Sequence, residues 1–305
     1  MTEITCVGQA LVDCITRGIE DSFAKKKVYR AGSISLSIGG DAMNEATVLS
    51  RLGHNVRLVC GVGDDPAGSL ILDRVKELGI DDRYVDRSVE RKTPIANLLI
   101  HEDGTRTSYN GHASLLEEYR PSDEVTKGTR ILSLASLFRA PLDDRDTIIR
   151  LVRAAKEHGA IVCADTKIPT FRQINLNDIS EILPLIDYFF PNDAEAAFFS
   201  GQKDPWGMAE FFCRAGIKHV MIKAGREGCY VMGNGERFHM KALPVKAIDG
   251  TGAGDNFVAG FLSGLLRGFS LYDCCRYGTV CAAACVQNPG ADGGVKSREE
   301  ADKLL

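Results

Sequence analysis

Short apolar runs alternate with amphipathic stretches along most of the chain. The apolar runs carry hydrophobic side chains on both faces, as is typical of strands buried inside a parallel sheet. They lie at Ile4–Gly8, Val56–Cys60, Arg130–Leu134, Ile161–Asp165, Ile186–Phe190, His219–Ile222 and Gly228–Met232. Helical stretches lie between most of them, at Asp41–Leu52, Ala67–Leu78, Asp143–His158 and Trp206–Ala215. This alternation predicts an α/β fold with a mostly parallel sheet covered by helices on each side.

Two segments depart from this pattern and predict a second, smaller sheet. Ser33–Ile38 alternates strictly between polar and apolar residues, which indicates a strand with one buried and one solvated face. Thr93–His101 and Thr105–Asn110 flank Asp103-Gly104, a strong hairpin turn signal. We expect an inserted β-sheet lid within residues 14–38 and 93–112. No repeat or Pro/Ser-rich linker divides the sequence, so we expect one domain over residues 1–305.

Composition narrows the class of partner. The chain has 305 residues, of which 44% are hydrophobic and 26% charged, and its formal net charge is −4. No excess of positive charge is present to neutralise a phosphate backbone, so we expect no nucleic acid partner. The start of the sequence is acidic and no apolar run reaches the roughly 18 residues of a spanning helix. We therefore expect a cytoplasmic protein without a membrane segment, whose ten cysteines are mainly buried reduced thiols.

The stretch from Asp249 to Asp255, Asp-Gly-Thr-Gly-Ala-Gly-Asp, carries the most chemical information. It precedes an apolar helical run, and small residues before a helix leave backbone N–H groups free to bind an anion. A carboxylate at an anion pocket suits a base that accepts a proton from a hydroxyl attacking phosphorus. The alternative is a glycine-rich turn in which Asp255 only stabilises the helix dipole.

A second motif lies about two hundred residues earlier. It consists of Gly39-Gly40-Asp41-Ala42-Met43-Asn44-Glu45-Ala46, followed by Gly53 and Gly63. With the stretch ending at Asp255, it resembles the paired signatures of the ribokinase-like (PfkB) carbohydrate kinases. Gly250 departs from the family pattern, which usually has Thr, Ser or Pro there. The resemblance covers nearly the whole chain and implies a three-layer αβα sandwich with a small β-sheet lid.

The resemblance also implies an activity and its main residues. It implies ATP-dependent phosphorylation of a sugar hydroxyl, with Asp255 as catalytic base and the amides of Gly252, Ala253 and Gly254 stabilising the γ-phosphate. Sugar hydroxyls would be held by four residues: Asp13, Gly39, Gly40 and Asn44. Read without the family, Asn44 is a solvated helix residue and Asp13 a turn residue.

Nucleotide and ion contacts follow from the same resemblance. Asn192 and Glu195 match a motif that helps position Mg²⁺ and phosphate, although Asn with Glu three residues later is equally a helix capping box. The expected nucleotide residues further along the chain are Lys223, Gly225, Gly228 and Asn288. The expected K⁺ ligands, found in many relatives, are at Asp249, Thr251 and Gly290.

Substrate choice is left open by the motifs. An uncharged ketose or pentose, such as fructose or ribose, comes first. Where many relatives have Asp-x-Asn-x-Arg, this chain has Asp165-Thr166-Lys167, and Lys167 with Arg139 and Arg106 would suit a sugar acid such as 2-keto-3-deoxygluconate. A nucleoside kinase and a non-catalytic sugar-binding regulator on the same fold are further alternatives.

Two further expectations concern other classes and assembly. A nicotinamide oxidoreductase is disfavoured because Val7-Gly8-Gln9-Ala10-Leu11 lacks the dinucleotide fingerprint. The apolar positions Ile34, Leu36 and Ile38 would either pair two lids in a homodimer or cover the chain's own active site.

Overall fold

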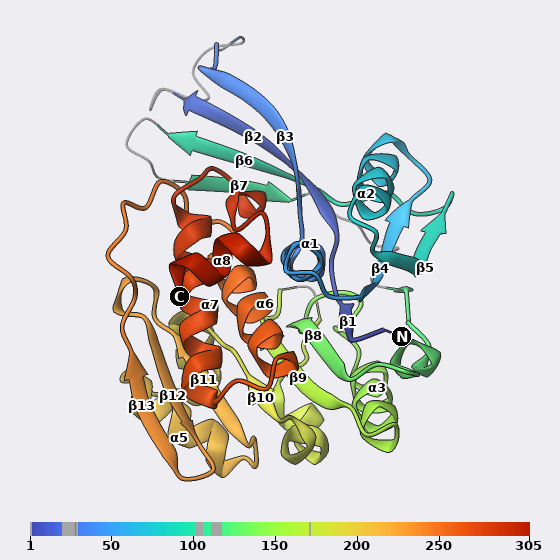
Figure 1. Ribbon diagram of the computed structural model, residues 1–305. Coiled ribbons are helices and arrows are strands. Elements are labelled where there is room, and N and C mark those ends of the chain that lie inside the picture. The colour runs from blue at the N-terminus through green and yellow to red at the C-terminus, as the bar shows by residue number, and fades with distance from the viewer. Residues whose placement is uncertain (1, 20–27, 29, 102–105, 111–117, 171) are drawn as a thin grey trace.

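The computed structural model describes residues 2–19, 28, 30–101, 106–110, 118–170 and 172–305. Its main element is a nine-stranded sheet in the order β13-β12-β11-β10-β9-β8-β1-β4-β5 (Figure 1). The strands are β1 (Ile4–Val7), β4 (Val56–Gly63), β5 (Asp81–Ser88), β8 (Ile131–Leu137), β9 (Ile161–Thr166), β10 (Tyr188–Phe189), β11 (His219–Lys223), β12 (Cys229–Gly233) and β13 (Glu236–Met240). All neighbours pair in parallel except β12, which is antiparallel to both β11 and β13. The predicted mostly parallel sheet is confirmed.

Two hydrophobic clusters cover the two faces of this sheet. One cluster takes residues from the helices α1 (Asp41–Arg51), α2 (Pro66–Glu77), α6 (Ala253–Leu266), α7 (Leu271–Val286) and α8 (Arg298–Leu304). The other takes residues from α3 (Arg145–Glu157), α4 (Asp193–Ser200), α5 (Pro205–Arg214) and the 3₁₀ segment η3 (Leu176–Leu185). The predicted three-layer arrangement is therefore confirmed.

The sequence pattern did not reveal two strands at the ends of the large sheet. β5 reads Asp-Asp-Arg-Tyr-Val-Asp-Arg-Ser and β13 reads Glu-Arg-Phe-His-Met. Each pairs with one neighbour only, so much of its surface meets water and needs no apolar residues. The buried strands between them have the apolar runs that a pattern can detect.

A separate four-stranded sheet, called here the small sheet, has the order β3-β2-β6-β7. Its strands are β2 (Leu11–Ile19), β3 (Ser33–Gly39), β6 (Ile95–His101) and β7 (Arg106–Asn110). The expected strand at Ser33–Ile38 is confirmed as β3, whereas the hairpin turn expected at Asp103-Gly104 lies outside the described residues. Figure 1 shows the small sheet extending along one side of the main body. Among the described residues, no helix is long and apolar enough to cross a membrane.

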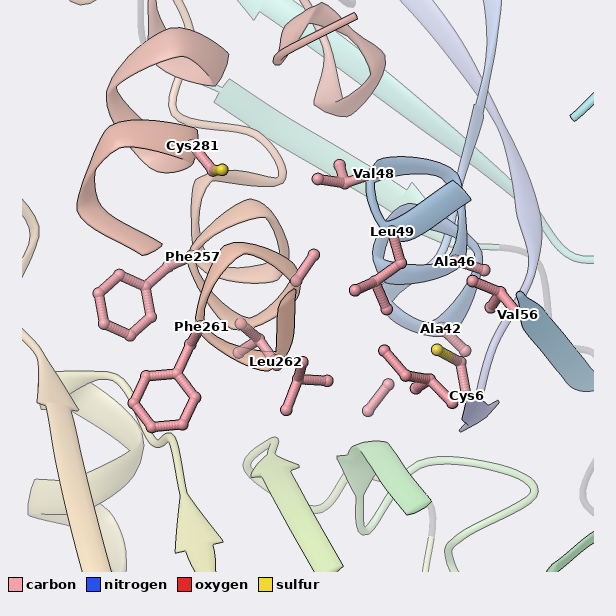
Figure 2. Packing of buried hydrophobic residues seen from close by; sticks show 14 of the residues in the cluster. Cys6, Ala42, Ala46, Val48, Leu49, Val56, Phe257, Phe261, Leu262 and Cys281 are labelled. Atoms are coloured by element: carbon pink, nitrogen blue, oxygen red, sulfur yellow. The ribbon is translucent and has the colours of Figure 1, made fainter. Parts of the chain in front are cut away.

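The packing of α1 against α6 determines where the two glycine-containing motifs meet in space. Leu49 of α1 is fully buried and points toward α6, whose Phe261 and Leu262 belong to the same cluster, whereas Ala42 and Ala46 lie on the side of α1 toward Cys6 and Val56 (Figure 2). As a result, the beginnings of both helices lie at the edge of the large sheet where its parallel strands end.

Candidate active site

The loop before α6 has a conformation that requires glycine. Gly252, at the N-cap of α6, has φ +74°, and a Cβ there would lie 2.6 Å from Cα of Ala291. The first amides of a helix have no acceptor within the helix, so they are available to an anion. The amide of Ala253 does contact the carbonyl of Gly250 at 3.3 Å, which engages it weakly. The start of α6 therefore has the backbone geometry of a phosphate-binding site.

Asp255 lies in the first turn of α6 and is almost completely buried, at 6% exposed. Its Oδ2 accepts a hydrogen bond of 2.7 Å from Nδ2 of Asn44 on α1. Burial, followed by the negative charge of Asp41, raises the pKa of Asp255 to about 7, against the opposing effects of Lys167, Asn44 and Lys223. A carboxylate with this pKa is well matched to accept a proton near neutral pH.

Two lysines at strand ends lie near the Asp255 carboxylate, and each is paired with acidic side chains. Nζ of Lys167, just after β9, lies 3.4 Å from Asp41 and 3.8 Å from Glu195. The charge of Asp41 raises the pKa of Lys167 despite burial, so the ammonium stays charged. Lys223, at the end of β11, forms an ion pair with the buried Asp165. These five charged residues connect the ends of β9 and β11 with the starts of α1 and α4 at one edge of the sheet.

The expected sugar residues are gathered where β2, β3 and α1 meet. Asp13 on β2 is buried and pairs in register with Ser37 of β3. A Cβ at Gly39 would lie 2.5 Å from Oδ2 of Asp13, so glycine leaves room for this carboxylate. Gly40 has φ +97° and a Cβ there would lie 2.5 Å from the carbonyl of Gln9, which makes glycine necessary.

Asn192 and Glu195 form the capping box that was the alternative interpretation of their motif. Asn192 Oδ1 accepts from the amide of Glu195, and Glu195 Oε2 accepts from the amide of Asn192, both at 2.9 Å. The remaining oxygen of Glu195 is the one that lies near Lys167. A contact between this pair and a metal ion stays a prediction.

The residues expected near the nucleotide have varied surroundings. Gly225 and Gly228 have φ +51° and +100° in the turn between β11 and β12, where left-handed backbone favours glycine. Asn288 is exposed and its Nδ2 donates to the carbonyl of Ala284, so its side chain is folded back on the end of α7. Its role in binding a nucleotide stays a prediction.

The carboxylate of Asp249 closes the loop that precedes α6. Its Oδ1 accepts from the amide and hydroxyl of Thr251, at 2.9 and 2.7 Å, and its Oδ2 accepts from the amide of Gly290 at 3.0 Å. A fourth donor, Arg17 of the small sheet, lies 3.3 Å from Oδ2. Burial raises the pKa of Asp249, but these hydrogen bonds outweigh it and the pKa is lowered overall. Within the described ranges, no group of three or more His, Cys, Asp and Glu side chains is arranged to hold a metal ion.

Comparison with known proteins assigns this arrangement to a family. The model of the pfkB family of carbohydrate kinases matches residues 1–298, nearly the whole chain. The chain belongs to the pfkB family of carbohydrate kinases. This kinase is thus a phosphotransferase with an alcohol acceptor, as its motifs indicated.

The similar proteins are named as kinases of different sugars. It is 29% identical over 293 residues to a 2-dehydro-3-deoxygluconokinase from Bacillus subtilis, with 91% of this chain and 89% of the relative covered. It is 28% identical over 276 residues to a ribokinase from Staphylococcus aureus, with 87% of each covered. Among solved structures it resembles an Arabidopsis thaliana ribokinase complexed with ribose and ATP, with a TM-score of 0.86, 24% identity and coverage of 100% and 99%. The last likeness shows the ribokinase-like fold.

Three charged residues of the site carried no recognisable signal in the sequence. Asp41 accepts from the hydroxyl of Ser136 and pairs with Lys167, yet in sequence it is only the first residue after two glycines. Asp165 was named only as the first residue of a stretch whose later positions depart from a family pattern. Arg17 lies 232 positions from its partner Asp249, so only the fold brings them together. Arg139, by contrast, was suspected, and its half-buried guanidinium donates to the hydroxyl of Thr170.

Proposed function

We propose that this kinase transfers the γ-phosphoryl group of ATP to a hydroxyl of an uncharged ketose or pentose, with Asp255 as catalytic base. The observation that carries the proposal is the position of Asp255, a buried carboxylate with a pKa of about 7 in the first turn of a glycine-initiated helix. Residues 1–305 would act as one kinase domain, with the small sheet as a lid over the sugar.

The mechanism follows from what these residues are able to hold. Asp13, Gly40 and Asn44 would orient the sugar with its reacting hydroxyl toward the oxygen of Asp255 that Asn44 does not occupy. Asp255 accepts the hydroxyl proton as the oxygen bonds to phosphorus and the bond from phosphorus to ADP breaks. The amides of Gly252, Ala253 and Gly254 would stabilise the charge of the transferred group. Exclusion of water by the lid would keep ATP from being hydrolysed.

Magnesium would accompany ATP, because phosphoryl transfer requires a cation that neutralises the phosphate oxygens. The pair of carboxylates near Lys167 and Lys223 fits such an ion only through water, since Glu195 and Asp165 already have protein partners. Asn192, Lys223, Gly225, Gly228 and Asn288 would lie along the nucleotide.

An uncharged sugar is preferred over a sugar acid because of the charge balance at Lys167. Its ammonium is already paired with Asp41 and Glu195, which leaves little positive charge for a substrate carboxylate. The sugar-acid alternative rests on Arg139, whose described contact is to a neutral hydroxyl. The charge of Arg139 is therefore the feature that would favour 2-keto-3-deoxygluconate, and the named B. subtilis relative keeps that substrate in the panel.

Three finer points belong to the same proposal. Potassium would bind near Asp249, Thr251 and Gly290, where carbonyls of Thr251 and Gly290 lie 3.4 and 4.0 Å from the thiol of Cys285. A homodimer would form through the small sheet, where Ile34 and Leu36 are 70% and 64% exposed. All ten cysteines are free, which suits the reducing cytoplasm.

The test is ADP release from Mg-ATP, with and without potassium, across ketoses, pentoses, sugar acids, sugar phosphates and nucleosides. Wild type and Asp255→Asn are compared at equal concentration, with ATP affinity measured separately. We expect turnover that depends on a ketose or pentose and falls by several orders of magnitude in the variant, with little change in ATP affinity. Near-normal turnover in Asp255→Asn would refute the base assignment. ATP binding without turnover on any compound would favour a non-catalytic regulator.

A further inference from the structure

An ion pair joins the small sheet to the loop that precedes α6. The guanidinium of Arg17, on β2, lies 3.3 Å from Oδ2 of Asp249. The Arg17 side chain is 32% exposed and that of Asp249 only 16%. Among the ion pairs that the described part of the chain forms, it alone links a strand of the small sheet to the loop of residues 249–254, called here the anion loop.

Arg17 completes the set of donors around Asp249. Each oxygen of that carboxylate accepts two hydrogen bonds, and three of the four donors come from Thr251 and Gly290. The fourth comes from Arg17. These contacts hold the two segments that surround Gly252, since Gly252 packs against Ala291 next to Gly290. Loss of one charged donor to a mostly buried carboxylate therefore weakens the joint that shapes the anion loop.

The same strand carries a residue of the expected sugar site. Asp13 and Arg17 are four residues apart on β2, and the register with β3 is regular between them. Residues at i and i+4 of a strand point to the same face, about 13 Å apart at the usual rise per residue. One short strand thus contacts the sugar site at one position and the anion loop at another.

A second contact connects the small sheet to the same loop region. A Cβ at Gly290 would lie 3.5 Å from Oγ of Ser37 on β3, and Ser37 is the register partner of Asp13. Ile38, the next residue, lines a small cavity together with Asn44 and Ala291. The small sheet therefore meets the region around Gly290 through two adjacent strands, β2 and β3.

We propose that Arg17 is a positioning residue that couples occupancy of the sugar site to the order of the anion loop. The inference rests on the proposed function. When a sugar holds Asp13 and the small sheet in place, Arg17 is held against Asp249 and the anion loop keeps the shape that binds the transferred phosphoryl group. Without sugar, the small sheet is free to move away, Asp249 loses its charged donor and the loop is less ordered. Phosphoryl transfer to water is then disfavoured.

The coupling is measured as the change in affinity for a non-hydrolysable Mg-ATP analogue when the sugar is saturating. For the wild type we expect the sugar to tighten analogue binding about 5-fold or more, the usual lower range for coupled sites. In Arg17→Met the ratio should fall close to one, and the ratio of sugar-dependent to sugar-independent ADP release should fall with it. The sugar is whichever compound supports wild-type turnover.

Two variants control for general effects. Arg17→Lys keeps the charge and should restore part of the coupling. Arg30→Met removes an exposed arginine just before β3 and should leave the coupling as in the wild type. Melting temperatures show whether each variant folds. If Arg17→Met does not fold, the coupling is compared between the wild type and Arg17→Lys, which have the same charge at position 17.

The outcomes separate the two hypotheses. If no compound supports wild-type turnover, the proposed function fails and this inference falls with it. If the wild type turns over a sugar but Arg17→Met keeps both the wild-type coupling and the wild-type ratio of ADP release, the kinase assignment stands and the role of Arg17 is refuted. Equal loss of coupling in Arg17→Met and Arg30→Met would also refute it, because the effect would then not depend on Asp249.

Discussion

Nδ2 of Asn44 donates a 2.7 Å hydrogen bond to Oδ2 of Asp255, although 211 residues separate them in the sequence. Each is in the first turn of its helix, and the close packing of α1 on α6 holds the two helix starts together. The bond fixes one carboxylate oxygen and leaves the other for a substrate. A residue that the sequence suggested as a sugar ligand thus also positions the proposed base.

The activity should depend on pH through Asp255. A base must be deprotonated to act, and burial raises the pKa of this group to about 7. We therefore expect kcat/KM for the sugar to fall as the pH drops through about 7 and to reach a plateau above it. Asp41→Asn removes a negative charge that raises this pKa, so its acidic limb should move to lower pH. An acidic limb near the ordinary aspartate pKa in the wild type would contradict the assignment.

Replacing Asn44 should move the same profile in the opposite direction. Asn44→Ala removes a hydrogen bond that lowers the pKa of Asp255, so the acidic limb should move to higher pH. At a pH on the plateau, kcat should still fall by about 10-fold or more, since the carboxylate loses its orientation. A rise in KM with an unchanged pH profile would instead mean that Asn44 only binds the sugar.

Two neighbouring glycines provide a matched test of the anion loop. Gly252→Ala places a side chain at φ +74° and against Ala291, so we expect a loss of at least about 1–2 kcal/mol in the free energy of unfolding. We also expect a marked fall in kcat/KM for ATP. Gly250→Ala meets nothing within 4 Å and has no positive φ, so it should change stability by no more than about 0.5 kcal/mol. Chemical denaturation and initial rates measure both, and equal effects would show that the loop shape does not matter.

The ion pair between Lys223 and Asp165 should be important for stability. Their side chains are only 13% and 1% exposed, so Lys223→Met leaves a buried carboxylate without its cation. We expect a loss of about 3–5 kcal/mol in the free energy of unfolding, largely recovered in the double variant with Asp165→Asn. Lys127, whose pair with Glu124 is 59% exposed on both sides, is the control, and Lys127→Met should cost less than about 1 kcal/mol. Urea denaturation of the ligand-free protein gives the comparison, and similar losses in the two lysine variants would argue against a special role for burial.

Much of the fold could be predicted because buried strands and amphipathic helices leave a periodic pattern. The central strands and the helices α1, α2, α3 and α5 follow that pattern closely. The edge strands β5 and β13 and the strand β2 did not, since their surfaces are partly solvated and their residues are mixed. Hydrophobic periodicity arises from burial, so it does not identify a strand that is only partly buried.

Some features of the site could likewise be predicted from the sequence, and others only from the fold. The sequence by itself determined the two glycine motifs and Asp255, because tight backbone turns at a helix start demand specific residue types in consecutive positions. Only the tertiary structure decided that Asn44 donates a hydrogen bond to Asp255, that Asp41 forms an ion pair with Lys167, and that Arg17 forms an ion pair with Asp249. These pairs join residues far apart in the chain, and their electrostatic effects depend on distance and burial. Neither quantity exists until the chain has folded.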